Sequence, residues 1–170
     1  MNERQSIANA TLEERGYHLY RGWSDTVAEQ LVALSHQPHI LAFTPNDAAT
    51  RFSSVEAAHE WHDSRERTVY TLGSEAVAGL IWFGKTQSPH VEGDYTFAIR
   101  IYEAAQGKGL ARPLMNAVHE DFREHTTYNN AIWLETDVDN VAARALYEKT
   151  GYIERALINE RVIMTQMPTE

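Results

Sequence analysis

The chain changes its hydrophobic period across one short glycine-containing turn, and that change limits the folds open to it. In DYTFAIRIYE (94–103), Ile99 and Ile101 alternate with polar neighbours, as expected of a β-strand. From Leu110 onward, LARPLMNAVHEDF carries apolar side chains at helical spacing. The turn QGKG (106–109) lies between the two patterns. The sequence therefore predicts a strand, a glycine turn and a helix in direct succession.

Strand and helix patterns on either side of this turn define the fold class. Ser53 and Glu56 have the spacing of a capping box at the start of one helix, and 37–52 is expected to be irregular. The order of elements predicts a mixed α/β (α+β) domain with a mostly antiparallel central sheet, flanked by helices and containing one βαβ crossover. Further strands are expected at 17–21, 67–72, 76–84, 131–136, 152–158 and 161–167, and further helices at 24–36, 53–62 and 140–150.

Length and composition fit a single domain spanning residues 1–170. The 170 residues are 43% hydrophobic, which is enough for a sizeable core. No apolar run is long enough for a membrane span, and the charged N-terminus lacks the apolar segment of a signal peptide. Because the chain has no cysteine, a disulfide framework and thiolate metal ligands are excluded. We therefore expect a cytoplasmic protein without a membrane partner.

The net charge of −9 bears on the class of partner. A nucleic-acid-binding face needs clustered Lys and Arg, so a nucleic-acid partner is not expected. An acidic surface favours a cationic ligand, such as an amine or a basic peptide.

The glycine turn is a candidate phosphate-binding loop, because free amides and a helix N-terminus meet there. The glycine and lysine pattern of a Walker A loop is absent from the chain. A dinucleotide-binding loop would use Gly107 and Gly109, but Arg112 occupies the position of its third glycine. A pyrophosphate loop, with Gln or Arg followed at fixed spacing by Gly and then Gly or Ala, is satisfied by Gln106, Gly109 and Ala111. On spacing alone, a plain strand-to-helix turn is an equal alternative.

A second motif, NVAARALYEKTGY (140–152), follows the turn later in the chain. Together with the turn, this motif resembles the GNAT superfamily of N-acetyltransferases. The resemblance covers roughly residues 95–167, with one departure at Glu103, where many relatives carry proline. The residues that match the family pattern in the second motif are Asn140, Ala143, Leu146, Tyr147, Glu148, Lys149, Gly151 and Tyr152.

The resemblance implies acetyl-CoA as co-substrate and assigns residues to it. Backbone groups of Ile99 and Ile101 would bond the pantetheine arm, and Asn140 and Tyr147 would also contact the coenzyme. Backbone amides of the turn would wrap the pyrophosphate, a role that falls to Gln106, Gly107, Lys108, Gly109, Leu110, Ala111 and Arg112.

The resemblance also implies direct acetyl transfer to a primary amine, with Glu135 and Tyr147 as catalytic residues. An amine must lose a proton before it attacks a thioester, because ammonium groups have pKa values of about 8 to 10.4. A carboxylate such as Glu135 can accept that proton, and a phenol such as Tyr147 can protonate the departing thiolate. Competing candidates for the base are His90, Glu92 and Asp94.

Other functions are compatible with parts of the sequence. As acceptor, a small-molecule amine and a peptide N-terminus are both compatible with it. A non-catalytic acyl-CoA-binding or sensor module would keep the turn without needing an acid or a base. A dinucleotide-binding oxidoreductase is disfavoured by Arg112. No metal site is expected, because His59 and His62 lack the spacing of a zinc-binding H-E-x-x-H motif. A homodimer is compatible with the sequence but not required by it.

Overall fold

A computed structural model describes residues 4–73 and 75–168 of the chain. The strands are β1 (Gln5–Ile7), β2 (Leu19–Arg21), β3 (Arg67–Leu72), β4 (Gly79–Lys85), β5 (Tyr95–Ile101), β6 (Ile132–Asp137), β7 (Ile153–Ile158) and β8 (Arg161–Gln166). The helices are α1 (Ala10–Glu14), α2 (Asp25–Leu34), α3 (Pro38–Phe43), α4 (Val55–Asp63), α5 (Ala111–His125) and α6 (Val141–Lys149). A π-helix, η1 (Asp47–Arg51), and a 3₁₀ turn, η2 (Glu103–Ala105), complete the described elements.

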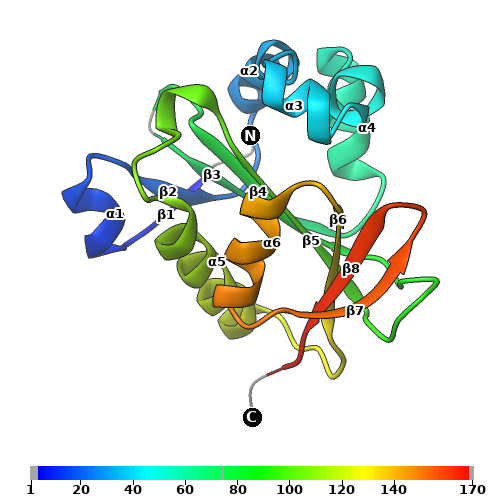
Figure 1. Ribbon diagram of the computed structural model, residues 1–170. Helices are drawn as coiled ribbons and strands as arrows, with labels where there is room; N and C mark the ends of the chain where they lie inside the picture. The colour runs from blue at the N-terminus through cyan, green and yellow to red at the C-terminus, as the bar shows by residue number, and fades with distance from the viewer. Residues whose placement is uncertain (1–3, 74, 169–170) are drawn as a thin grey trace. The chain divides into compact units, whose positions relative to one another are not determined.

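In the described residues, the strands form one sheet in the order β1-β2-β3-β4-β5-β6-β8-β7 (Figure 1). The pairs β1–β2, β2–β3, β6–β8 and β7–β8 are antiparallel, whereas β5–β6 is parallel. Helix α5 makes the connection between the two parallel strands. The predicted fold class, a mostly antiparallel sheet with helices and one βαβ crossover, is confirmed.

The chain divides into two compact units. The first unit comprises 1–82 and 99–110, and the second comprises 83–98 and 111–170. Strands β4 and β5 run from one unit into the other, so the residues of β5 belong partly to each core.

In the first unit, helices α2 and α4 pack against each other (Figure 1), and the core is aromatic. The ring of Trp61 lies 5.0 Å from those of both Phe52 and Trp82, and 5.8 Å from that of Trp23. Its contacts with Phe52 and Trp82 are edge-to-face, the arrangement that the quadrupole of an aromatic ring favours.

A buried ion pair fixes η1 to strand β5 inside the same unit. The fully buried carboxylate of Asp47 accepts from Arg100 Nε at 2.7 Å and from Arg100 Nη2 at 3.2 Å, and Arg51 Nη1 lies 3.0 Å away. The guanidinium of Arg100 also covers the ring of Trp82 at 4.8 Å. Because removal of one partner would strand a charge in the core, Arg100 and Asp47 hold each other in place.

The core of the second unit forms where α5 packs on β4 and β5. Phe122 stacks on Phe83 with ring centroids 4.0 Å apart, and Tyr95 meets Phe122 edge-to-face at 5.2 Å. His119 is buried among these rings. Its Nδ1 donates to the Met115 carbonyl at 2.7 Å, which leaves Nε2 to accept from the Tyr152 hydroxyl at 2.7 Å.

The helices predicted at 24–36, 53–62 and 140–150 begin within two residues of their predicted starts. The predicted cap Ser53 is wrong, because the Ser54 hydroxyl accepts from the Ala57 amide at 3.0 Å and begins α4. The Ser53 hydroxyl donates to the Thr50 carbonyl instead. Asn140 does cap α6, as predicted.

The expectation that 37–52 is irregular is wrong, since α3 and η1 lie there. Strand β1 and helix α1 were not predicted either. Helix α1 has five residues and α3 has six, so neither gives a helical pattern long enough to recognise. Helix α3 also lacks a side-chain cap that could mark its start. No helix in the described part of the chain combines the length and the apolar character needed to cross a bilayer.

Burial makes His119 a source of pH-dependent stability. Desolvation lowers the pKa of His119 to about 4, opposed by its hydrogen bond to Met115 and reinforced by Arg123. In an unfolded chain the pKa is about 6.5. Between these values only the unfolded state binds the proton, so the free energy of unfolding should fall by roughly 3 kcal/mol as the pH drops from about 6.5 to 4. Urea unfolding at a series of pH values in this range measures the effect.

The variant His119→Gln should lose this part of the pH dependence, whereas His36→Gln should keep the slope of the wild type, because His36 is exposed. Equal slopes for His119→Gln and the wild type would contradict the assignment.

Candidate functional site

The predicted site residues fall into two groups, one in each unit. The turn residues from Gln106 to Leu110, with Ile99 and Ile101, belong to the first unit. Ala111, Arg112, Glu135, Asn140 and Tyr147 belong to the second unit.

The backbone of the turn requires glycine at two places. Gly107 and Gly109 have φ angles of +72° and +66°, a region that costs a residue with a side chain roughly 1–2 kcal/mol. A Cβ added at Gly107 would meet no described atom within 4 Å, so the turn is open at that point.

The amides of the turn are available as donors. No backbone hydrogen bond within the described residues uses the N–H groups of Gly107, Lys108 or Gly109. Helix α5 begins directly after the turn at Ala111, and the first amides of a helix have no partner inside it. Pro113 carries no N–H, but it lies in the first turn of α5, where an amide has no partner inside the helix. No hydrogen bond of the helix is therefore lost. Such a run of free donors suits a diphosphate or another multiply charged anion.

Two side chains of the turn are engaged inside the first unit. Lys108 Nζ donates to the Tyr17 hydroxyl at 2.9 Å, and Gln106 Nε2 donates to the Ile101 carbonyl at 3.1 Å. The backbone amide of Gln106 also has a partner, the Glu103 carbonyl at 3.2 Å. Main-chain groups after Gln106 are thus the part of the turn that can bind a ligand.

The predicted strand residues Ile99 and Ile101 present their backbone to one edge of β5. Tyr102 N donates to the Ala78 carbonyl at 3.0 Å, so the backbone N–H of residue 102 points toward the β4 side of the strand. Because backbone groups alternate along a strand, Ile99 and Ile101 point to the opposite edge. The Ile101 carbonyl already accepts from Gln106, and it lies 3.0 Å from His39 Nε2.

The ladder between β5 and β6 is short. It pairs Tyr95 with Ile132 and Thr96 with Trp133, although both strands continue beyond these residues. A sheet strand whose neighbour departs keeps unpaired N–H and C=O groups on that edge, and these need another partner. The backbone of β5 after Thr96 can therefore bind an extended ligand as an added strand would.

Asn140 and Tyr147 lie at the two ends of α6 in the second unit. Asn140 Oδ1 accepts from the Ala143 amide at 3.2 Å, so capping uses its oxygen and leaves its side-chain N–H groups. Tyr147 is 7% exposed, and its ring lies 6.5 Å from Phe97 and 5.9 Å from Tyr152. The position of Tyr147 is thus set by packing.

Glu135 and Tyr147 belong to opposite faces of the sheet. Tyr95, which contacts α5, is paired with Ile132, so the side chain of Ile132 faces the helices. Side chains alternate along a strand, and Glu135 therefore points to the other face. Tyr147 lies on the helix side, because it contacts Phe97, two residues after Tyr95.

The carboxylate of Glu135 is accessible. Its side chain is 33% exposed, and Oε2 lies 3.8 Å from Arg161 Nε, a long contact for an ion pair. Exposed pairs of this kind contribute at most about 1 kcal/mol, so the carboxylate can exchange this partner for another cation.

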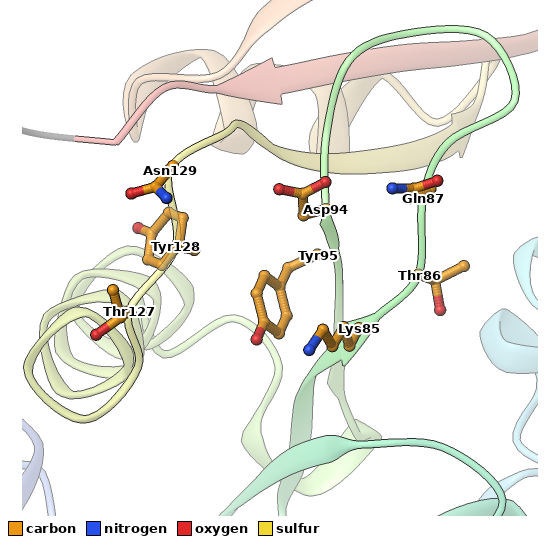
Figure 2. A pocket seen from close by; sticks show the side chains of 8 residues that line it. All are labelled: Lys85, Thr86, Gln87, Asp94, Tyr95, Thr127, Tyr128 and Asn129. Carbon is orange, nitrogen blue, oxygen red and sulfur yellow. The ribbon is translucent and has the colours of Figure 1, made fainter.

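Asp94, a competing candidate for the base, directly precedes the first paired residue of the β5–β6 ladder. Its amide donates to the Ala131 carbonyl at 3.1 Å, next to the first paired residues. Figure 2 shows Asp94 and Tyr95 between the 127–129 segment and the 85–87 segment. Together they line a pocket of about 500 Å³. Of the residues predicted for the co-substrate or for catalysis, the competing base candidate Asp94 lines this pocket, whereas Glu135, Tyr147 and the residues predicted for the coenzyme do not.

His59 and His62 are used in packing. The indole Nε1 of Trp23 donates to His59 Nδ1 at 3.1 Å, and the ring of His62 stacks on Trp23 at 4.7 Å. Within 4–73 and 75–168, no group of three or more His, Asp or Glu residues is placed to hold a metal ion.

Arg144, which the sequence did not mark as functional, secures the start of α6. It donates to Glu154 Oε1 at 2.7 and 2.9 Å and to the Val138 carbonyl at 2.9 Å. These contacts tie the segment that carries Asn140 to β7. Only its place on the helix face of Asn140 and Tyr147 could have indicated this role.

Known proteins resemble this chain in sequence. The model of the Acetyltransferase (GNAT) family matches residues 29–152. Mycothiol acetyltransferase of Paenarthrobacter aurescens (strain TC1) is 28% identical over 123 residues, which cover 71% of this chain and 36% of that protein. The chain thus spans about a third of the length of this relative.

Solved structures resemble it in fold. AAC(6')-Ib in complex with paromomycin and acetyl-CoA has a TM-score of 0.71 and 18% identity, covering 89% of this chain and 93% of that one. A spermidine N-acetyltransferase SpeG chimera from Vibrio cholerae and hSSAT has a TM-score of 0.66 and 22% identity, covering 89% and 95%. At these identities the likeness concerns the fold.

The left-handed glycine at 109 should be needed for ligand binding as well as for folding. Both Gly109→Ala and Gly151→Ala place a side chain at positive φ, and both should cost roughly 1–2 kcal/mol of stability. Only Gly109→Ala disturbs the turn, so it should weaken the binding of coenzyme A, used as a diphosphate probe, by about fivefold or more. Titration calorimetry of both variants measures this.

Gly151→Ala is the matched control, because Gly151 makes no contact with the turn in the described residues and a Cβ there would meet only the Gln166 side chain, at 3.6 Å, an ordinary contact distance. Equal affinities of the two variants for coenzyme A would contradict a role of the turn in binding.

Proposed function

Because the chain belongs to the Acetyltransferase (GNAT) family, we propose that it is an acetyl-CoA-dependent N-acetyltransferase that moves an acetyl group directly to a primary amine. In this proposal, residues 1–170 act as a single cytoplasmic N-acetyltransferase domain. The observation that carries it is the turn of free amides that directly precedes α5, at the end of a strand with an incomplete ladder.

The chain offers main-chain groups for each part of the co-substrate. When bound, acetyl-CoA supplies a thioester whose carbonyl carbon is the electrophile. The N–H groups from Gly107 to Arg112 would hold its diphosphate. The edge of β5 at Ile99 and Ile101 would hold the amides of its pantetheine arm. The side-chain N–H groups of Asn140, which capping leaves unused, would also donate to the coenzyme.

Glu135 and Tyr147 would act as base and acid. The carboxylate of Glu135, directly or through one water, would take a proton from the ammonium of the acceptor, so that the free amine can attack the thioester carbon. The hydroxyl of Tyr147 would give a proton to the sulfur as the thiolate leaves. Their location on opposite faces of the sheet supports this division, because nucleophile and leaving group occupy different sides of the carbon under attack. No side chain has to form an acyl intermediate.

The acceptor is a primary amine, either of a small molecule or of a peptide N-terminus. The net charge of −9 supports a cationic acceptor. A spermidine N-acetyltransferase is among the proteins with the same fold.

Two measurements test the proposed function. Titration of the protein with acetyl-CoA should give saturable binding, and a panel of amines and short peptides should then include acceptors that release free thiol. Binding without thiol release from any acceptor would favour a non-catalytic acyl-CoA sensor of the same fold. If acetyl-CoA does not bind, the proposal is wrong.

Substitution of the proposed base or acid should lower the rate of acetyl transfer, an effect that can be measured separately from acetyl-CoA binding. Glu135→Gln and Tyr147→Phe should each lower kcat by roughly 10²-fold, because each removes one proton transfer. The dissociation constant for acetyl-CoA should change little in Glu135→Gln. This variant should also lose the rise of kcat/KM with pH that a base produces. Steady-state kinetics across a pH series, with calorimetry at one pH, gives both quantities.

Asp94→Asn and Tyr128→Phe are matched controls, since they make the same chemical changes in the pocket of Figure 2. Both should retain near wild-type kcat. A large loss in Asp94→Asn together with full activity in Glu135→Gln would transfer the role of base to Asp94.

A further inference from the structure

Arg15 reaches the glycine turn from a distant part of the chain. It follows the last residue of α1, and its amide donates to the Leu12 carbonyl at 3.1 Å. Its guanidinium Nη1 donates to the Lys108 carbonyl at 3.0 Å and to the Gly109 carbonyl at 2.6 Å. One guanidinium nitrogen therefore binds two consecutive carbonyls of the turn.

These two hydrogen bonds determine where the neighbouring amides point. In a trans peptide, the C=O of one residue and the N–H of the next point in opposite directions. With the carbonyls of Lys108 and Gly109 turned toward Arg15, the N–H groups of Gly109 and Leu110 point away from it. Two successive amides are then directed to the same side, which is the arrangement that binds an anion.

A second contact from the same segment holds the turn. Lys108 Nζ donates to the Tyr17 hydroxyl at 2.9 Å and lies 5.5 Å from the centre of the Tyr17 ring. Since the N–H groups of Gly107, Lys108 and Gly109 enter no backbone hydrogen bond in the described chain, the turn depends on these side-chain contacts for its conformation.

Glycine at position 109 fits this arrangement sterically. A Cβ at Gly109 would lie 3.0 Å from Arg15 Nη1, which is closer than nearly all such contacts. The guanidinium can approach both carbonyls because no side chain intervenes.

We infer that Arg15 is a positioning residue for the diphosphate of acetyl-CoA, acting through the turn: it binds the carbonyls of Lys108 and Gly109 and thereby directs the amides of Gly109 and Leu110 toward the ligand. This inference rests on the proposed function. Arg15 also keeps two carbonyl oxygens, which would repel a phosphate, turned away from it. Its positive charge, on the carbonyl side of the turn, would also attract a ligand that carries several negative charges.

The test compares donors with and without a diphosphate. Arg15→Met should raise the dissociation constant of coenzyme A, measured by titration calorimetry, by about tenfold, as expected for the loss of hydrogen bonds from a charged donor. It should raise KM for acetyl-CoA similarly and leave kcat nearly unchanged. With S-acetylpantetheine, which has the same thioester without the diphosphate, kcat/KM should equal that of the wild type. Arg15→Lys should restore part of the affinity.

Two further variants serve as a negative control and as an alternative test. Arg65→Met removes another exposed arginine of the first unit and should leave coenzyme A binding unchanged. Tyr17→Phe removes the second contact and should give a smaller loss of the same kind. It provides the test if Arg15→Met does not fold.

The inference is overturned if Arg15→Met binds coenzyme A as the wild type does, or if it loses the same factor with S-acetylpantetheine. A wild-type protein that fails to bind coenzyme A at all would overturn the proposed function first. If the wild type binds coenzyme A, a loss of affinity in Arg15→Met but not in Arg65→Met tests the role of Arg15 separately from the proposed function.

Discussion

The parallel ladder between β5 and β6 ends after two pairs of residues, and the incomplete pairing governs the rest of the candidate site. Peptide groups inside a protein need hydrogen-bond partners, so a strand edge without a neighbour must find another one. On its other edge β5 is bonded, as the contact of Tyr102 with Ala78 demonstrates. The backbone of this single strand is thus available to a ligand on one side only.

Side chains secure both the strand and the turn that follows it. The buried pair of Asp47 and Arg100 fixes one residue of β5 to η1. Arg15 and Tyr17 hold the turn a few residues later. A ligand that binds to main-chain atoms gains affinity only when those atoms are already in place, because ordering them on binding would cost conformational entropy. Both sets of contacts supply that order before any ligand arrives.

The sequence predicted the elements that have long or strongly periodic patterns, and missed those without them. Alternation around Ile99 and the helical stripe from Leu110 identified the crossover correctly. The cap Asn140 was recognisable because its side chain satisfies a local amide. Helix α1 and the π-helix η1 are too short for periodicity, and η1 has no side-chain cap to mark its start. Glu135 was predicted only through the family resemblance, in which a Glu–Tyr pair has this spacing, and the faces of the sheet to which Glu135 and Tyr147 belong follow only from the register.

The role of Arg15 could not be read from the sequence at all. Its partners Lys108 and Gly109 are more than ninety residues away, and no local pattern connects them. In the sequence, a single arginine after a short helix cannot be distinguished from any other solvent-exposed residue. Long-range contacts of this kind depend on how the chain folds, which residue spacing does not encode.

Recognition by peptide groups also has an evolutionary consequence. A main-chain donor is the same whichever side chain its residue carries, so substitutions along β5 and the turn can accumulate without removing a single hydrogen-bonding group. Positions with left-handed backbone, such as Gly107 and Gly109, and the buried, ion-paired Arg100 of β5 would resist replacement. Such a fold can diverge very far in sequence, as its 18% identity to AAC(6')-Ib at a TM-score of 0.71 illustrates. Lineages are then free to remodel the side chains around an acceptor while the inherited backbone stays as it was.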